Sequence, residues 1–333
     1  AHNNAFNHPE LAHCPVREPS SKASLFFQDE HEPEWLMQSN TVPDPFPEIV
    51  VSNTPVPSVP EEIRQRVGRV LEGRFRLSAG TTTLLNLLNA PETSPAEITQ
   101  AVMHDPNFAT RILRIVNSAQ FGLAQPITAV GRAVVLLGFN NIRSITMAHM
   151  LSAHKSGVDS SHLRELWLHS AICSACAASI AKKSGSGVEP GDAATIGLLV
   201  DIGKMLMKAE ETGFLSTQTG VAPSVIEGFA GSCFAESWGL PVLVRQVLES
   251  LNIAFHYPVE RIPAEYRQLT LIVALANFIT RWYGFSNGDA PEMPSREMLD
   301  AIGWHASSTG HWVDPETALE MEKARTAVQV YFS

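Results

Sequence analysis

The chain has 333 residues, of which 44% are hydrophobic and 17% charged, and its formal net charge is −10. This composition is typical of a globular protein with one large core or two smaller ones, and the longest apolar runs are too short to span a membrane. The acidic balance argues against binding along a nucleic-acid backbone. Four scattered cysteines and no visible secretory signal favour the cytoplasm over secretion.

Residues 1–60 differ in composition from the rest of the chain. They hold ten of the 22 prolines, and eight acidic residues face only two basic ones. Because each proline lacks an amide hydrogen and biases its predecessor towards extended backbone, we expect an irregular, Pro-rich tail or linker here rather than a helix. Apolar residues at 25–27, 35–37 and 46 could dock this segment on the folded body; a mobile tail is the alternative.

From residue 61 onward, apolar residues recur at helical spacing between short loops. Ser94, followed by Pro95 and Glu97, has the pattern of a capped helix start, and Asp105-Pro106 repeats it. No convincing strand pattern occurs, so the fold class is all-α. The predicted helices cover residues 61–74, 81–89, from 95, from 106, 126–138, 139–154, 161–184, 191–208, 223–237, 241–251, 263–283, 294–302 and 315–331.

A carboxylate stands in an apolar helical stretch at Gly197-Leu198-Leu199-Val200-Asp201-Ile202-Gly203-Lys204. A buried charge needs a partner or a metal ion to offset its desolvation. The residue before Asp201 is Val200, whose side chain has no lone pair and cannot bind a metal. The stretch therefore resembles a metal-site motif that lacks one of its ligands.

An ordered set of short motifs resembles the HDOD domain, an all-helical domain of bacterial signalling proteins. HDOD domains are related to the HD superfamily of metal-dependent phosphohydrolases, and many lack the metal-binding residues. The resemblance covers roughly residues 70 to 285. It is carried by residues 84–89, 104–106, 114–119, 121–122, 127 and 133–138, by Asp-Ile-Gly-Lys at 201–204, and by Trp-Gly-Leu-Pro at 238–241.

The resemblance implies a multi-helical fold of two packed halves. Residues 1–60 would be the acidic tail, residues 61–155 the N-terminal half, residues 156–285 the HD-like half, and residues 286–333 a C-terminal helical extension. The segment at 155–162 would join the two halves and is a candidate hinge.

The resemblance also assigns the positions of the HD metal site. His169 matches the first histidine, Val200 and Asp201 take the place of the His-Asp pair, and Lys204 closes that motif. Glu227 and Asn277 stand where a further histidine and the last aspartate are expected. We therefore expect no metal or cofactor; a divalent ion held by His169, Asp201 and Glu227 is the alternative.

Two further groups of residues are candidates for sites. Cys173 and Cys176 form a Cys-x-x-Cys pair in a helix without a second pair, which favours close helix packing over a zinc site. The predicted helices of the N-terminal half also carry four arginines. They are either a basic patch for a ligand or partner, or ordinary solvated residues: Arg111, Arg114, Arg132 and Arg143.

Together these features favour a non-catalytic HDOD module of bacterial signal transduction that binds a protein partner or small ligand. The competing hypothesis is a divergent metal-dependent HD phosphohydrolase that acts on a nucleotide or a phosphodiester. A metal bound beside His169 and Asp201 would support the enzyme, and a closed apolar site would support the module.

Overall fold

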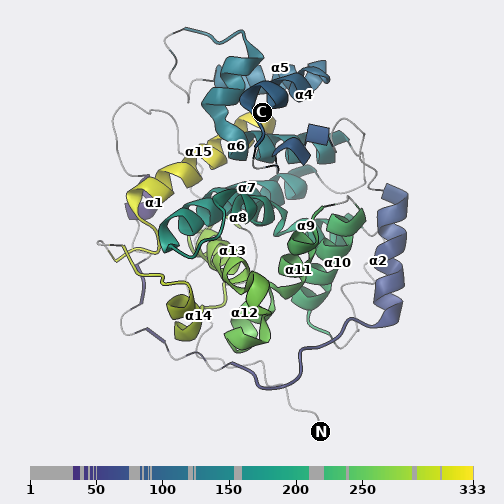
Figure 1. Ribbon diagram of the computed structural model, residues 1–333, viewed down its shortest axis with the longest axis vertical. Coiled ribbons are helices and arrows are strands. Elements are labelled where there is room, and N and C mark those ends of the chain that lie inside the picture. The colour runs from purple at the N-terminus through teal and green to yellow at the C-terminus, as the bar shows by residue number, and fades with distance from the viewer. Residues whose placement is uncertain are drawn as a thin grey trace.

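Helices form the regular structure of the chain in the computed structural model (Figure 1). No β-strand occurs within the described residues, whose one β-type contact is an isolated bridge between Thr41 and His311. The all-α prediction is confirmed. The structure describes residues 33–37, 41–43, 46–47, 49, 51–74, 83–84, 86–88, 90, 92–118, 123, 125–153, 160–209, 221–237, 240–286, 291–307 and 310–332. Across them, no helix combines the length and the apolarity that crossing a bilayer requires.

The helices between residues 61 and 153 are α2 (Glu61–Arg74), α4 (Pro95–Met103), α5 (Pro106–Val116) and α6 (Val130–Ala153). Local capping signals set the starts of α4 and α5. Ser94 and Glu97 form the predicted capping box, with the Ser94 amide donating to the Glu97 carboxylate at 2.8 Å. The Asp105 carboxylate caps α5 by accepting from the Phe108 amide at 3.0 Å. Gly138, with φ of +72°, interrupts α6 where the sequence predicts two helices to meet.

The long helix α7 (Ser160–Ser184) lies in the middle of the molecule (Figure 1). The sequence predicts one helix over 191–208, and this prediction is wrong. The chain instead forms α8 (Pro190–Leu199) and α9 (Ile202–Ala209), with Val200 and Asp201 in the turn between them. Asp201 thus stands at the start of α9, where its carboxylate is directed by tertiary contacts described below.

The remaining helices surround α7 and its neighbours. Helices α8, α13 and α15 pack directly on α7, and α15 also contacts α5 and α6, so the C-terminal helix joins both predicted halves. The buried apolar side chains form one continuous core cluster. The elements are α10 (Pro223–Ser237), α11 (Val242–Ser250), α12 (Ile253–His256), a 3₁₀ turn (Val259–Arg261), α13 (Ala264–Trp282), α14 (Arg296–Ala301) and α15 (Pro315–Phe332).

Several sequence features lie outside the described residues. They are the apolar residues 25–27, most of the candidate hinge, the motif at 121–122, and parts of the motifs at 84–89, 114–119 and 238–241. The division of the chain at residues 60, 155 and 285 stays a prediction.

An N-terminal strap, defined as the described part of residues 33–60, runs along the body. Its first turn, α1 (Glu34–Met37), is helical where no helix is expected, because packing rather than propensity holds it. The Trp35 indole donates to Glu322 of α15 at 3.0 Å and its ring meets Tyr283 edge-on. Farther along, the Val42 amide donates to the Gly310 carbonyl at 2.8 Å.

We expect Trp35→Ala to loosen this strap. The change removes the hydrogen bond to Glu322 and the ring contacts, and since Trp35 is only half-buried the loss should be about 1–2 kcal/mol. Limited proteolysis should then cut residues 33–60 faster than in the native chain. Val56→Ala, at an exposed strap position, is the control. Equal cleavage of all three proteins would contradict a docked strap.

Candidate functional site

The candidate site is built around a buried histidine–aspartate pair. His169 projects from α7, and Asp201 stands 32 residues later in the turn between α8 and α9. Both side chains are fully buried, and His169 Nδ1 lies 2.5 Å from Asp201 Oδ2. The contact ties the central helix to the α8–α9 turn.

Lys204 completes the group from the first turn of α9. Its Nζ donates to Asp201 Oδ1 at 2.6 Å, and its side chain is 23% exposed. Burial by itself would raise the pKa of the Asp201 carboxyl, but the interactions with His169 and Lys204 outweigh burial and hold the pKa well below its ordinary value. Asp201 is therefore a carboxylate at neutral pH.

The resemblance assigns three more positions to this site: Val200, Glu227 and Asn277. Val200 is half-buried and packs against the core. Glu227 lies on α10, and its backbone contacts α9 at Gly203: a Cβ there would come 1.9 Å from the Glu227 carbonyl oxygen. Asn277 lies on α13, and its buried Oδ1 has no hydrogen-bond partner among the described residues.

The residues present do not fit a catalytic metal ion. Among the described residues, no three His, Cys, Asp or Glu side chains gather closely enough to hold one. His169 Nε2 is buried without a hydrogen-bond partner in this part of the chain and has the right chemistry for a ligand. Both oxygens of Asp201 are already engaged, however, and a catalytic site needs about three protein ligands.

The four arginines do not form one exposed patch. Arg143 is 4% exposed and donates to the Leu88 carbonyl. Burial lowers the pKa of its guanidinium to about 10, against the opposing effect of the Asp192 carboxylate on α8. Arg143 therefore links α6 to the chain around Leu88. Arg114 and Arg132 are exposed, and Arg111 is half-buried.

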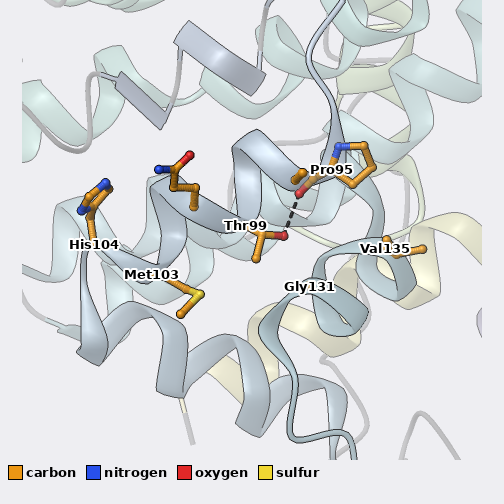
Figure 2. A pocket seen from close by; sticks show the side chains of 8 residues that line it. Pro95, Thr99, Met103, His104, Gly131 and Val135 are labelled. Atoms are coloured by element: carbon orange, nitrogen blue, oxygen red, sulfur yellow. Dashed lines mark hydrogen bonds between the residues drawn. The ribbon is translucent and has the colours of Figure 1, made fainter.

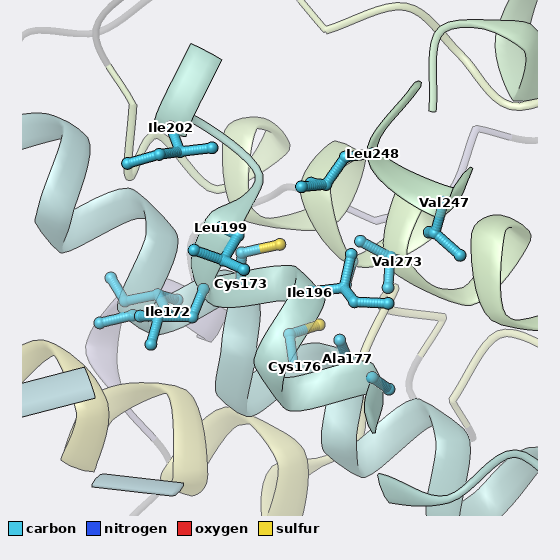
Figure 3. Close-up of a cluster of buried hydrophobic side chains, with 14 of the residues drawn as sticks. Ile172, Cys173, Cys176, Ala177, Ile196, Leu199, Ile202, Val247, Leu248 and Val273 are labelled. Carbon is cyan, nitrogen blue, oxygen red and sulfur yellow. The ribbon is translucent and has the colours of Figure 1, made fainter. Parts of the chain in front are cut away.

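The two cysteines of the Cys-x-x-Cys pair are packing residues. Cys173 and Cys176 lie among apolar side chains from α7, α8, α11 and α13 (Figure 3). Burial raises the pKa of both thiols well above the ordinary value, so neither is a thiolate at neutral pH. The packing interpretation fits these surroundings.

A surface hollow of about 650 Å³ lies between α4 and α6, and the sequence did not point to it (Figure 2). Met103 and Val135 on its walls are 61% and 65% exposed. The signal was the apolar run at 133–137, because five consecutive residues of a helix point in different directions. Ala133, Val134 and Leu137 are buried, whereas Val135 and Leu136 are exposed. The lining residues are Pro95, Ala96, Thr99, Gln100, Met103, His104, Gly131 and Val135.

Comparisons with known proteins agree with the helical architecture. Residues 76–215 match the family model of the HDOD domain. An uncharacterized protein of Treponema pallidum is 26% identical over 227 residues, which make up 63% of this chain and 42% of that protein. This chain therefore spans less than half the length of that relative.

Three solved structures share the fold. A phosphohydrolase candidate from Shewanella amazonensis has a TM-score of 0.57 at 19% identity, covering 81% of this chain and 98% of its own. An HDOD domain protein from Geobacter sulfurreducens has a TM-score of 0.55 at 18% identity, with the same coverage. A candidate signal transduction protein from Marinobacter aquaeolei has a TM-score of 0.58 at 16% identity, covering 82% and 66%. Identities this low establish the fold alone.

Proposed function

Because the chain carries an HDOD domain, we propose that it is a non-catalytic module of bacterial signal transduction, acting in the cytoplasm by binding a protein partner. The observation that carries this proposal is the closed group of His169, Asp201 and Lys204. Asp201 is the one acidic residue retained at the ligand positions of the motif. Each of its carboxylate oxygens lies within hydrogen-bonding distance of a neighbouring side chain. A reaction at this position would need a metal ion that the residues do not fit.

The surface of the N-terminal half supports a binding function. The apolar hollow between α4 and α6 is broad and open, with exposed Met103 and Val135 on its walls. Such surfaces suit protein contacts better than the enclosed binding of a small molecule. A protein partner is therefore favoured over a small ligand.

The competing function is a divergent phosphohydrolase acting on a nucleotide or phosphodiester. It would require Glu227 or Asn277 to substitute for the missing ligands. Glu227 packs its backbone on α9 at Gly203, and it does not join His169 and Asp201 in a group able to hold a metal among the described residues. An amide such as Asn277 is a weak replacement for a carboxylate ligand of a catalytic ion.

Metal analysis and a hydrolysis assay test the proposal. We expect protein purified without chelator to hold no stoichiometric transition metal. We also expect no turnover of bis(p-nitrophenyl) phosphate or of cyclic dinucleotides in the presence of Mn²⁺. The reason is that Val200 removes a central ligand and Lys204 already engages Asp201.

Asp201→Asn is the matched variant for this experiment. About one or two metal ions per native chain, together with turnover that Asp201→Asn abolishes, would contradict the non-catalytic function. Activity that persists unchanged in Asp201→Asn would indicate a contaminating hydrolase and leave the proposal standing.

A further inference from the structure

The N-terminal strap lies on the body of the protein by way of two aromatic side chains, Trp35 and Phe46. In Figure 1 its purple trace passes from α1, which contacts α15, along the lower edge of the molecule to α2. The strap lies outside residues 76–215, which match the HDOD model, so that match assigns it no role.

The first anchor is Trp35, in the helical turn α1. Its ring meets Tyr283 and Phe285 edge-on, with ring centroids 4.9 Å apart in each pair. Its indole N–H donates to the Glu322 carboxylate at 3.0 Å. Leu36, the next residue, is 1% exposed and is thus fully inserted into the body. A buried apolar side chain beside an aromatic ring with a satisfied N–H group is typical of the anchors by which proteins bind peptides.

The second anchor is Phe46, eleven residues after Trp35. Its ring lies 6.3 Å from the ring of Trp312, and the Arg296 guanidinium lies 4.9 Å from its centroid. Between the two anchors the main chain takes part, since the Val42 amide donates to the Gly310 carbonyl at 2.8 Å. Side-chain anchors separated by main-chain hydrogen bonds are the pattern by which a protein surface recognises an extended peptide.

The strap does not fill the surface on which it lies, and its connection to α2 is exposed. A hollow of about 300 Å³ remains between the strap at Phe46 and the start of α14 at Arg296. The linker, defined as residues 53–58, is exposed throughout and contains two prolines. Val59, which follows it, is 7% exposed and fixes the start of α2. Residues 33–52 can therefore leave the body at the linker while α2 stays in place.

The surface beneath the strap is aromatic and needs cover. With the strap in place, Trp312 and Tyr283 are 1% and 6% exposed. Departure of Trp35 and Phe46 would uncover these rings together with Phe285. A contiguous apolar patch on a protein surface marks a site of protein contact. An occupant that replaces the strap therefore has to supply aromatic anchors of its own.

We propose that the strap is an intramolecular ligand of a peptide-binding groove, and that an extended segment of a partner protein with the same anchors displaces it. The fitting segment carries a Trp-Leu pair and, eleven residues after the tryptophan, a phenylalanine between two prolines. The inference rests on the proposed function of binding a protein partner. It adds a surface separate from the hollow between α4 and α6, and makes the strap an autoinhibitory contact. The strap groove is defined by Tyr283, Phe285, Arg296, Trp312 and Glu322.

Peptide binding to a full chain whose strap can be severed tests this proposal. A protease recognition sequence is inserted between Thr54 and Pro55, in the exposed linker. The chain folds with its strap attached, and cleavage then removes only the tether. The probe is a fluorescein-labelled peptide with the sequence of residues 33–52, and fluorescence anisotropy follows its binding. The matched control peptide has alanine in place of Trp35 and Phe46.

We expect the labelled peptide to bind the cleaved chain at least about tenfold more tightly than the uncleaved chain. The reason is that a tethered strap competes at an effective concentration of about 1 mM, an advantage that cleavage removes. The control peptide should bind neither form. In the cleaved chain, Arg296→Ala should weaken binding about 2- to 5-fold through loss of the contact with Phe46. Arg132→Ala, at an exposed arginine of α6, should leave it unchanged.

A second variant keeps the test independent of the inserted sequence. Trp35→Ala combined with Phe46→Ala in the uncleaved chain weakens both anchors of the resident strap. This chain should also bind the labelled peptide more tightly than the native chain does, because the competing strap has lost its rings.

Two results would overturn the proposal. One is equal binding of the peptide by cleaved and uncleaved chains, or equal binding of the two peptides by the cleaved chain. The other is loss of the cooperative melting transition once gel filtration removes the severed strap, because the strap would then be an integral part of the core. Hydrolytic activity in the assay described above would instead overturn the proposed function, so the two failures are distinguishable.

Discussion

Replacing Gly203 with alanine should destabilise the protein by about 4 kcal/mol or more, the largest loss expected from any single methyl group in the motif. A Cβ on Gly203 would lie 1.9 Å from the carbonyl oxygen of Glu227 and 2.7 Å from its carbonyl carbon. Both atoms belong to the backbone of α10, so no side chain can rotate away. Helices α9 and α10 would have to separate, and the contacts between them would be lost.

Chemical denaturation followed by circular dichroism measures this loss. Gly68→Ala is the matched control, because Gly68 lies within helix α2 and a Cβ there meets nothing within 4 Å. That substitution should stabilise the protein by about 0.5–1 kcal/mol through helix propensity. A Gly203→Ala variant as stable as the native chain would mean that α9 and α10 do not pack this closely.

Replacing Asp201 with alanine should cost about 3 kcal/mol. The change leaves the buried His169 imidazole without its partner and removes the carboxylate that accepts from Lys204. The loss of stability is limited because the side chain of Lys204 is partly exposed, so its ammonium group can be solvated by water in the variant. Asp300→Ala, at an exposed position of α14, should change stability by less than about 0.5 kcal/mol.

The difference in unfolding free energy between the native chain and Asp201→Ala should become smaller as the pH falls. The pKa of Asp201 is lowered in the folded protein, so its carboxylate binds protons less readily there than in the unfolded chain. Its contribution is therefore complete above the ordinary aspartate pKa of about 4 and declines as the pH falls below it. Denaturation curves at pH 7 and pH 3 check this. A stability difference that is larger at pH 3 than at pH 7 would contradict the lowered pKa of Asp201.

The retained residues of the Asp-Ile-Gly-Lys motif each have a structural task in this fold. Asp201 pairs with the central helix, Gly203 allows α10 to approach, and Lys204 balances the carboxylate. These three residues therefore hold the α8–α9 turn against α7 and α10.

Signals that act within one turn of helix were readable in the sequence. The Ser94–Glu97 capping box and the Asp105 cap each span three residues, and both form as predicted. The bounds of α2 at Glu61 and Arg74 also agree with the predicted range. Helix propensity, capping and apolar spacing depend only on neighbouring residues, so they can be identified without knowledge of the fold.

The break between α8 and α9 shows where this local reasoning ends. Residues 191–208 have helical spacing throughout, but the chain turns at Val200 and Asp201. The contact of Asp201 with His169 crosses 32 residues of sequence, and the strap contact of Trp35 with Glu322 crosses 287. No periodic pattern encodes pairings of that separation.

The sequence by itself determined the helical class and most helix bounds. The tertiary structure alone decided that Lys204 engages Asp201, that Arg143 is buried, and that Met103 and Val135 line an exposed hollow. The physical reason is that secondary structure follows from neighbouring residues, whereas burial and charge pairing depend on which distant helices come into contact.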